Sequence, residues 1–141
     1  MNRFTPSHRT ARRAAVLATI GFAVIAVFQA ALAAGASLGH AAWGGAEAEL
    51  TTGERIGSGI AVVLWAIATL VVLGRAGPWG RAEPTRLFHW GTWFFAALTA
   101  ISAVAQFASE SRWENSIWGP LALILAALCT IVALSPPTTG S

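Results

Sequence analysis

The sequence predicts an all-α fold: a four-helix transmembrane bundle of up-down-up-down topology, formed by a single membrane domain over residues 1–141. The first observation is compositional, because 55% of the residues are hydrophobic and only 11% are charged, whereas soluble domains carry about a quarter of their residues charged. The second is that uncharged apolar stretches alternate with short polar segments. The third is that the arginines concentrate in every second polar segment. Short connections make antiparallel neighbours the simplest arrangement.

Four stretches are long enough to cross a membrane as helices, which takes roughly 20 mostly apolar residues for about 30 Å of hydrocarbon. They are residues 14–34, 56–73, 87–107 and 117–134. The first also resembles a secretory signal that is cleaved after small residues. However, its apolar run is longer than the usual signal core of about 7 to 15 residues. We therefore favour a retained first span, with cleavage as the alternative.

Small residues at four-residue spacing give the later spans flat faces, on which a neighbouring membrane helix can pack closely. In chain order these faces are Gly53, Gly57 and Ala61; Thr92, Ala96 and Ala100; and Ala122, Ala126 and Thr130. Such close faces predict a tightly packed bundle.

The fourth span has a recognisable start and end. Asn115 or Ser116 can cap its first turn, and Pro120 falls where a missing backbone N–H costs least. Pro136 and Pro137 cannot continue the helix and should stop it.

The arginines predict the orientation, because short cytoplasmic loops carry an excess of positive charge. Seven of the nine lie in the N-terminal segment and the middle loop: Arg3, Arg9, Arg12, Arg13, Arg75, Arg81 and Arg86. Both termini and the middle loop are therefore expected in the cytoplasm, and the other two loops outside. A composition rich in arginine and alanine and free of lysine suggests a GC-rich bacterial genome. We expect a multi-pass protein of the bacterial cytoplasmic (inner) membrane, with no nucleic-acid partner.

The first outer loop, residues 35–53, holds the most structured polar feature. Its glycines allow backbone angles closed to other residues. These angles would bring five candidate contact residues together near the outer surface: His40, Trp43, Glu47, Glu49 and Glu54. One interpretation is a site for a cation or a polar ligand. The other, which we favour, is an interfacial loop anchored by its tryptophan, with solvated glutamates.

Charged residues of both outer loops form a second group of candidate contacts. Glu54 and Arg55 in one loop, and Glu110, Arg112 and Glu114 in the other, could pair across the bundle. Exposed pairs of this kind contribute about 0 to 1 kcal/mol. We expect them to orient the loops and not to perform acid–base chemistry.

Two amide side chains inside the spans complete the candidates. Gln29 and Gln106 are expected either to bond each other between the first and third helices or to cap loop backbone. Each lies near the outer end of the first helix of a hairpin, so the chain resembles a loose tandem of two hairpins. Trp65 falls near mid-membrane, where its indole N–H needs a partner, so it should face the bundle.

Several function classes are disfavoured. No span carries a central carboxylate that could change charge, as a proton-coupled exporter requires. The sequence has no Walker loop, HExxH or GxSxG motif, and one cysteine, Cys129, cannot form a redox pair. His40 and His89 are expected on opposite sides of the membrane, which disfavours haem. We expect no catalytic residue, metal or other cofactor.

Two segments carry a resemblance to a known group. Residues 35–59 contain Leu38-Gly39, Trp43-Gly44-Gly45 and Arg55-Ile56-Gly57-Ser58, and residues 114–120 read Glu-Asn-Ser-Ile-Trp-Gly-Pro. With these motifs the chain resembles a group of small four-helix bacterial membrane proteins that have a Trp-Gly-Gly outer loop. The resemblance implies the fold and the location, but no activity. Where that group often has proline in the loop, this chain has Ser37 and Thr51-Thr52.

These observations lead to three functional hypotheses. The leading one is a non-enzymatic interaction or accessory protein, which contacts the lipid bilayer and acts through helix packing and its outer loops, as a homo-oligomer or with a membrane protein partner. The second is a small transporter or channel formed by oligomerisation. The third is an outward-facing metal or ligand sensor. A transporter requires a polar path between helices, whereas an accessory protein should have a dry interior.

Overall fold

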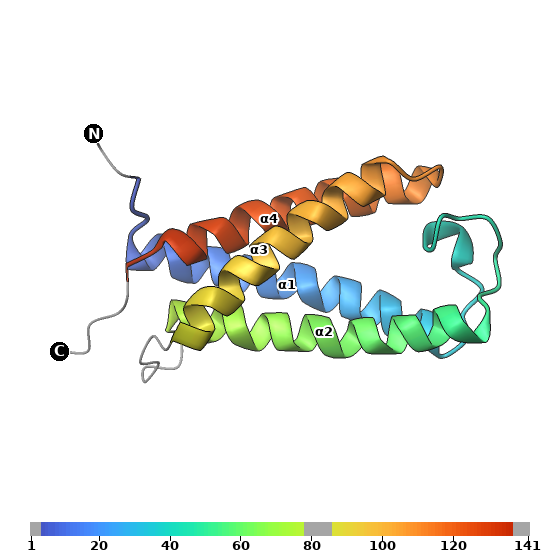
Figure 1. Ribbon diagram of the computed structural model, residues 1–141, viewed down its shortest axis with the longest axis horizontal. Helices are drawn as coiled ribbons and strands as arrows, with labels where there is room; N and C mark the ends of the chain where they lie inside the picture. The colour runs from blue at the N-terminus through green and yellow to red at the C-terminus, as the bar shows by residue number, and fades with distance from the viewer. Residues whose placement is uncertain (1–3, 78–85, 137–141) are drawn as a thin grey trace.

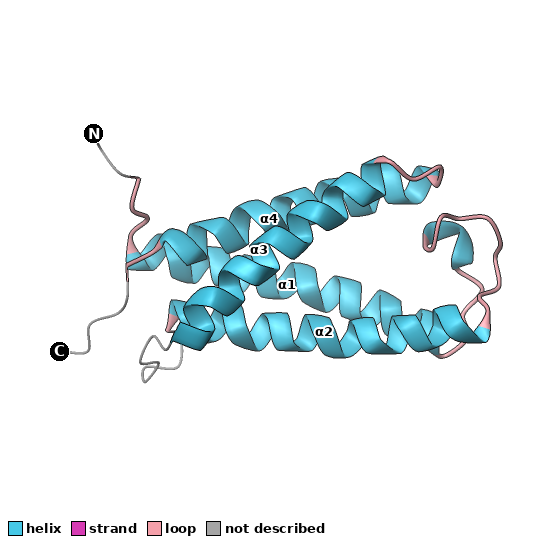
Figure 2. Cartoon of the chain, in the orientation of Figure 1, coloured by secondary structure: helices cyan, strands magenta, loops and turns pink. Residues whose placement is uncertain are grey.

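The computed structural model describes residues 4–77 and 86–136. Its main elements are four long helices, α1 (His8–Ala33), α2 (Thr52–Ala76), α3 (Arg86–Phe107) and α4 (Gly119–Leu134), and the described residues contain no strand (Figures 1 and 2). Each helix is long and apolar enough to cross a membrane, if the last span is counted from Glu114 to Leu134. The predicted fold class is confirmed. Three residues used in the sequence analysis lie outside the described residues: Arg3, Arg81 and Pro137.

The helices form two antiparallel hairpins, α1–α2 and α3–α4. Along the bundle α4 packs against α1, and α3 meets α2. We call the end with the chain termini the terminal end, and the end with the two loops, residues 34–51 and 108–113, the loop end. Figure 1 shows the hairpins close together at the terminal end and diverging toward the loop end, where the first loop folds back between them. This divergence creates the space in which a site can form.

The helix boundaries follow from local capping. Ser7 accepts a hydrogen bond from the backbone N–H of Thr10 at 3.2 Å, so α1 begins before the apolar run does. At the start of α2, Thr51 and Glu54 form a reciprocal capping box, which satisfies two donors that the helix leaves unpaired. At the other end Gly77, with φ +68°, closes the helix in the left-handed region that glycine favours.

The expected cap of the fourth span is wrong. Helical backbone begins directly after Ser111, whose hydroxyl lies 3.4 Å from the backbone nitrogen of Glu114. Asn115 and Ser116 lie inside the turn that follows, Glu114–Trp118, which is a π-helix and leads into α4. The helical start at Arg112 therefore lies upstream of both. Pro120 does lie in the first turn of α4, as predicted.

The bundle core is apolar and built largely from small residues toward the terminal end. It contains Ala14, Ala15, Ala18, Phe22, Ala68, Val72, Phe95, Ala96, Leu125, Cys129 and Val132. A Cβ on Gly21 of α1 would lie 2.7 Å from a methyl carbon of Leu125, so these two helices approach closely because that position is glycine. Such contacts supply the van der Waals packing that holds helices together in lipid.

The small-residue faces predicted for the second, third and fourth spans are only partly used in this way. Ala96 and Ala122 are buried, but Ala100 is exposed. Nothing lies near Gly53, and the neighbour of Gly57 is the ring of Trp43, which belongs to the loop and not to a helix. The four-residue spacing of small residues identified faces on which a helix could pack. Which of these faces contact another helix depends on how the two hairpins diverge, and the spacing does not show this.

Arg75 behaves differently from the loop arginine that we expected. Because α2 continues to Ala76, Arg75 is helical and buried, with 6% of its surface exposed. Its guanidinium donates a hydrogen bond to the carbonyl of Ser135 at 2.6 Å. This contact fastens the end of α2 to the end of α4 and closes the terminal end of the bundle.

Candidate ligand pocket between the hairpins

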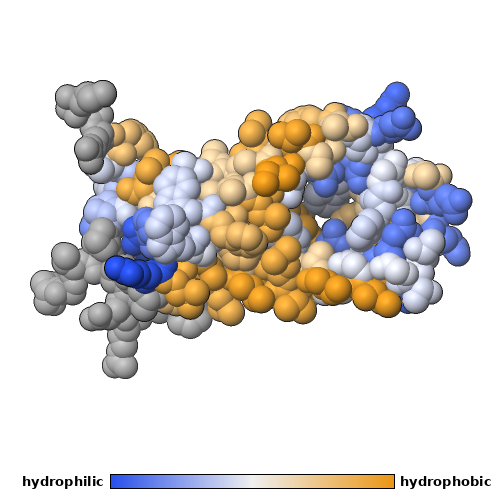
Figure 3. Space-filling model, viewed as in Figure 1, coloured by the Kyte–Doolittle hydropathy of each residue, from blue (hydrophilic) through white to orange (hydrophobic). Residues whose placement is uncertain are grey.

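A cavity of about 270 Å³ lies where the two hairpins diverge, at the loop end of the bundle. All four helices, the first loop and the π-helical turn contribute to its wall. The space-filling view shows a hollow at this end bounded by hydrophilic residues, next to a hydrophobic belt across the middle of the molecule (Figure 3). The cavity is thus a recess at one end of the bundle whose largely apolar wall carries a few polar side chains.

The first loop forms the roof of this cavity because its backbone adopts unusual angles. Trp43, Gly44 and Gly45 have φ values of +53°, +83° and +72°, in the left-handed region that side chains rarely adopt. At Gly45 a Cβ would lie 2.8 Å from the carbonyl oxygen of His40. The glycines are therefore required for a turn that brings the loop back over the open end of the bundle.

Three hydrogen bonds tie the roof to the second hairpin. The hydroxyl of Ser111 donates to the carbonyl of His40 at 2.9 Å, and the indole N–H of Trp118 donates to the carbonyl of Ala41 at 2.8 Å. The backbone N–H of Gly44 donates to a carboxylate oxygen of Glu114 at 3.1 Å. These bonds cross the gap between the hairpins, so the loop holds the two hairpins at a fixed separation and keeps the cavity open.

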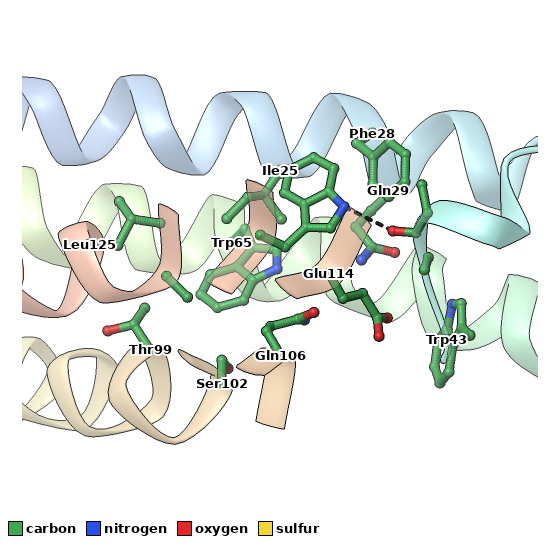
Figure 4. A pocket seen from close by; sticks show the side chains of 14 residues that line it. Ile25, Phe28, Gln29, Trp43, Trp65, Thr99, Ser102, Gln106, Glu114 and Leu125 are labelled. Atoms are coloured by element: carbon green, nitrogen blue, oxygen red, sulfur yellow. Dashed lines mark hydrogen bonds between the residues drawn. The ribbon is translucent and has the colours of Figure 1, made fainter. Parts of the chain in front are cut away.

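Glu114 is the carboxylate of the cavity. Only 7% of its surface is exposed, and the hydroxyl of Ser109 donates to its second oxygen. A carboxylate offers about four acceptor positions, so the two donors from the protein leave half of that capacity unused. No cationic side chain within the described residues forms an ion pair with it, and Arg112 nearby in sequence is exposed. A buried carboxylate with free acceptor capacity faces this cavity (Figure 4).

Gln29 of α1 and Gln106 of α3 line the same cavity from opposite hairpins. We expected these amides to bond each other or the loop backbone, and neither arrangement occurs. Among the described residues three buried side-chain nitrogen or oxygen atoms lack a hydrogen-bond partner, and two of them are the Oε1 atoms of these glutamines. Leaving a buried polar atom unpaired costs about 1–3 kcal/mol. Orphan atoms that gather in one cavity indicate a place where a partner from outside is expected.

Aromatic rings form the apolar part of the wall. Trp65 stacks on Phe22, with ring centroids 5.5 Å apart, at the side of the cavity that adjoins the apolar core. The rings of Phe28 and Trp118 are 4.6 Å apart near the roof, and Figure 4 shows Trp65, Gln106 and Glu114 around one space. Trp65 faces the bundle, as predicted. Its N–H has no acceptor among the described residues, although we expected one to be needed.

Among the remaining predicted contact residues, Trp43 lines this cavity and the others lie outside it. His40 is exposed, with Nδ1 3.0 Å from the carbonyl oxygen of Gly45. Trp43 adjoins the cavity, with its N–H directed to the hydroxyl of Ser58 at 3.2 Å. The exposed Glu47 and Glu49 line a neighbouring cavity of about 240 Å³ together with the capping Glu54. No group of three or more histidine, cysteine or acidic side chains within residues 4–77 and 86–136 is placed to hold a metal ion.

The predicted charge pairs between the outer loops do not form. Arg55 instead donates to the carbonyl of Ala33 at 3.1 Å, and its guanidinium lies against Gly35. Glu110 and Arg112 are exposed. In the described part of the chain no ion pair joins these loop residues, because the arginine of each loop lies away from the glutamates of the other.

Comparison of the chain with protein-family models, curated proteins and solved structures gave no match. The fold and the cavity therefore define its class by themselves. It is a small four-span membrane protein with a pocket at one end of the bundle, in which a few polar groups converge from an apolar and aromatic wall.

Proposed function

We propose that this protein binds a small molecule in the pocket at its loop end and has no catalytic activity. The observation that carries the proposal is the pair of buried amide oxygens on Gln29 and Gln106, which face one cavity without a partner. Binding pockets typically combine apolar and aromatic walls with a few converging polar groups. This cavity has that composition, and neither a histidine nor a cysteine stands beside its single carboxylate in the described wall.

The orientation belongs to the same proposal. Arg9, Arg12, Arg13, Arg75 and Arg86 all lie toward the terminal end of the bundle, where cytoplasmic positive charge is expected. The loop end, and with it the pocket, would then face the outside of a bacterial cytoplasmic membrane. The ligand would enter from that side or from the outer leaflet.

Binding is favoured over transport by one copy of the chain. Beyond Trp65 and Phe22 the described interior is an apolar core, mainly of alanine, valine and leucine. The fully buried polar side chains between the pocket and Arg75 in the described residues are Thr92 and Thr99, whose hydroxyls donate to carbonyls of their own helix. A ligand in the pocket meets a closed floor. An accessory role through the outer loops, and a channel formed by several copies, stay predictions that no observation on the described residues favours.

Cysteine accessibility tests the proposal. Ser102 lines the pocket and Thr92 is fully buried lower on the same helix, so cysteines at these positions, in a Cys129→Ala background, form a matched pair. We expect an impermeant thiol reagent applied outside intact cells to modify Ser102→Cys but not Thr92→Cys. An unmodified Ser102→Cys would contradict the open pocket. Modification of both would reveal a water-filled path and favour transport.

A further inference from the structure

We propose that the ligand is a compact organic amine with one positive charge, held by its ammonium group at Glu114 and by its apolar part against Trp65 and Trp118. This inference rests on the proposed binding function and deepens it by naming the ligand class. Three properties of the pocket lead to it: its charge, the kind of hydrogen-bonding groups that it offers, and its aromatic walls.

The charge of the pocket is the first argument. Glu114 is more than nine-tenths buried and is the one ionisable side chain in the described wall of the cavity. Burying a charge is costly unless it is paired and hydrogen-bonded. The protein supplies two hydrogen bonds, from Gly44 and Ser109, but no ion pair. A ligand with a single positive charge would neutralise the carboxylate.

The hydrogen-bonding groups are the second argument. The orphan Oε1 atoms of Gln29 and Gln106 are acceptors, and so is the carboxylate of Glu114. An ammonium group carries three N–H donors and no acceptor, so it matches three oxygens that reach one cavity from three segments of the chain. A carboxylate or phosphate ligand would instead place its own acceptors against these three oxygens.

The aromatic walls are the third argument. Indole faces attract cations, with about 0.5–1 kcal/mol at exposed sites and about 2 or more where water is excluded, and they also provide apolar contact area. Trp65 and Trp118 offer such surfaces beside the polar groups. A bare metal ion would leave these walls unused.

The size of the cavity limits the ligand. A volume of about 270 Å³ corresponds to about nine water molecules at ~30 Å³ each. This space suits an alkyl or arylalkyl amine of roughly that number of non-hydrogen atoms. Two sources supply a primary ammonium at a membrane surface: a free amine, and the headgroup of phosphatidylethanolamine.

A matched series of probes tests the ligand class on the full chain in amine-free detergent. Cyclohexylmethylamine, cyclohexylmethanol and cyclohexanecarboxylate have the same ring and differ in charge, and binding is measured by calorimetry and by tryptophan fluorescence. We expect the amine to bind at least tenfold more tightly than the alcohol, and the carboxylate not to bind. Equal binding of amine and alcohol, or binding of the carboxylate, would overturn the amine assignment while leaving a ligand pocket.

Charge-neutral variants locate the ammonium group. Glu114→Gln keeps an acceptor for the N–H of Gly44 and should weaken amine binding at least tenfold, with little change for the alcohol. Glu110→Gln, on an exposed residue of the same loop, is the matched control and should bind as the native protein does. If Glu114→Gln is not folded, Gln106→Met takes its place, with an expected loss of several-fold. Unchanged amine affinity in the folded variant would refute the assignment.

Bilayer composition separates the two sources. The reference bilayer is phosphatidylcholine, which is likewise without net charge but carries no N–H group. If the lipid is the ligand, competition by the headgroup should make the apparent affinity for the probe amine lower in phosphatidylethanolamine nanodiscs than in phosphatidylcholine nanodiscs. Equal affinity in both identifies a free amine. If none of the three probes binds, the amine assignment is overturned. The proposed function then depends separately on whether Ser102→Cys is modified from outside.

Discussion

Replacing Gln106 by methionine should stabilise the ligand-free protein, which is an unusual expectation for a buried polar residue. Its Oε1 atom is inaccessible and unpaired, and such an atom costs about 1–3 kcal/mol. Methionine has a similar shape and no oxygen, so it removes that cost. Because the cavity carries polar side chains and has room for water, which can relieve part of the cost, we expect the lower part of that range, an increase of about 1 kcal/mol in the free energy of unfolding.

The matched control is Asn115→Leu, another exchange of an amide for an apolar side chain of similar shape. The amide of Asn115 does have a partner, since it donates to the carbonyl of Ser109, so its removal should lower the free energy of unfolding by about 0.5–1.5 kcal/mol. Unfolding of both variants can be followed by tryptophan fluorescence in mixed micelles with increasing SDS. A loss of stability in Gln106→Met as large as that in Asn115→Leu would show that this glutamine has a native partner, and would refute the reasoning.

Further predictions concern the packing of the roof, and all can be followed in the same unfolding assay. Gly57→Ala should lower the free energy of unfolding by about 1–3 kcal/mol, because its Cβ would lie 2.7 Å from the Trp43 ring. Gly53→Ala has no neighbour near the added Cβ and should raise it by about 0.5–1 kcal/mol. Equal effects at both positions would contradict the contact between Gly57 and Trp43. Ser111→Ala removes both a helix cap and a bond to the roof and should cost about 1–2 kcal/mol; a neutral result would mean that neither bond matters. Trp118→Phe keeps a ring in place but loses the N–H bond to the roof, so a loss of about 0.5–1.5 kcal/mol is expected, and a much larger loss would indicate that ring packing dominates.

The four spans could be predicted because two independent features of the sequence mark the same segments. A segment that crosses lipid must form its own backbone hydrogen bonds as a helix, and it therefore appears as a long apolar stretch. The arginines lie in the polar segments between these stretches and mark the same boundaries. The exact ends of the helices could not be predicted in this way. Arg75 was counted as a loop charge, whereas its long side chain folds back to the carbonyl of Ser135, and no local pattern distinguishes these two outcomes.

The pocket was predicted in parts and not as a whole. Gln29, Gln106, Trp43 and Glu114 were all candidates, but they were assigned to separate roles because their proximity depends on how the hairpins diverge. The sequence does contain one pattern that predicts the position of Glu114. Ser111 and Glu114 have the three-residue spacing of a helix-capping motif, which places the glutamate in the first turn of a helix and not in a solvated loop.

Native mass spectrometry of the protein released from its own membranes tests the central claim, ligand binding in this pocket, most directly. Ala122→Phe would fill the cavity from α4, and Ala127→Phe places the same ring on the exposed side of that helix as a control. We predict an added small-molecule mass on the native protein and on Ala127→Phe, and none on Ala122→Phe. The bare chain in all three spectra, or the same added mass on both variants, would contradict the account.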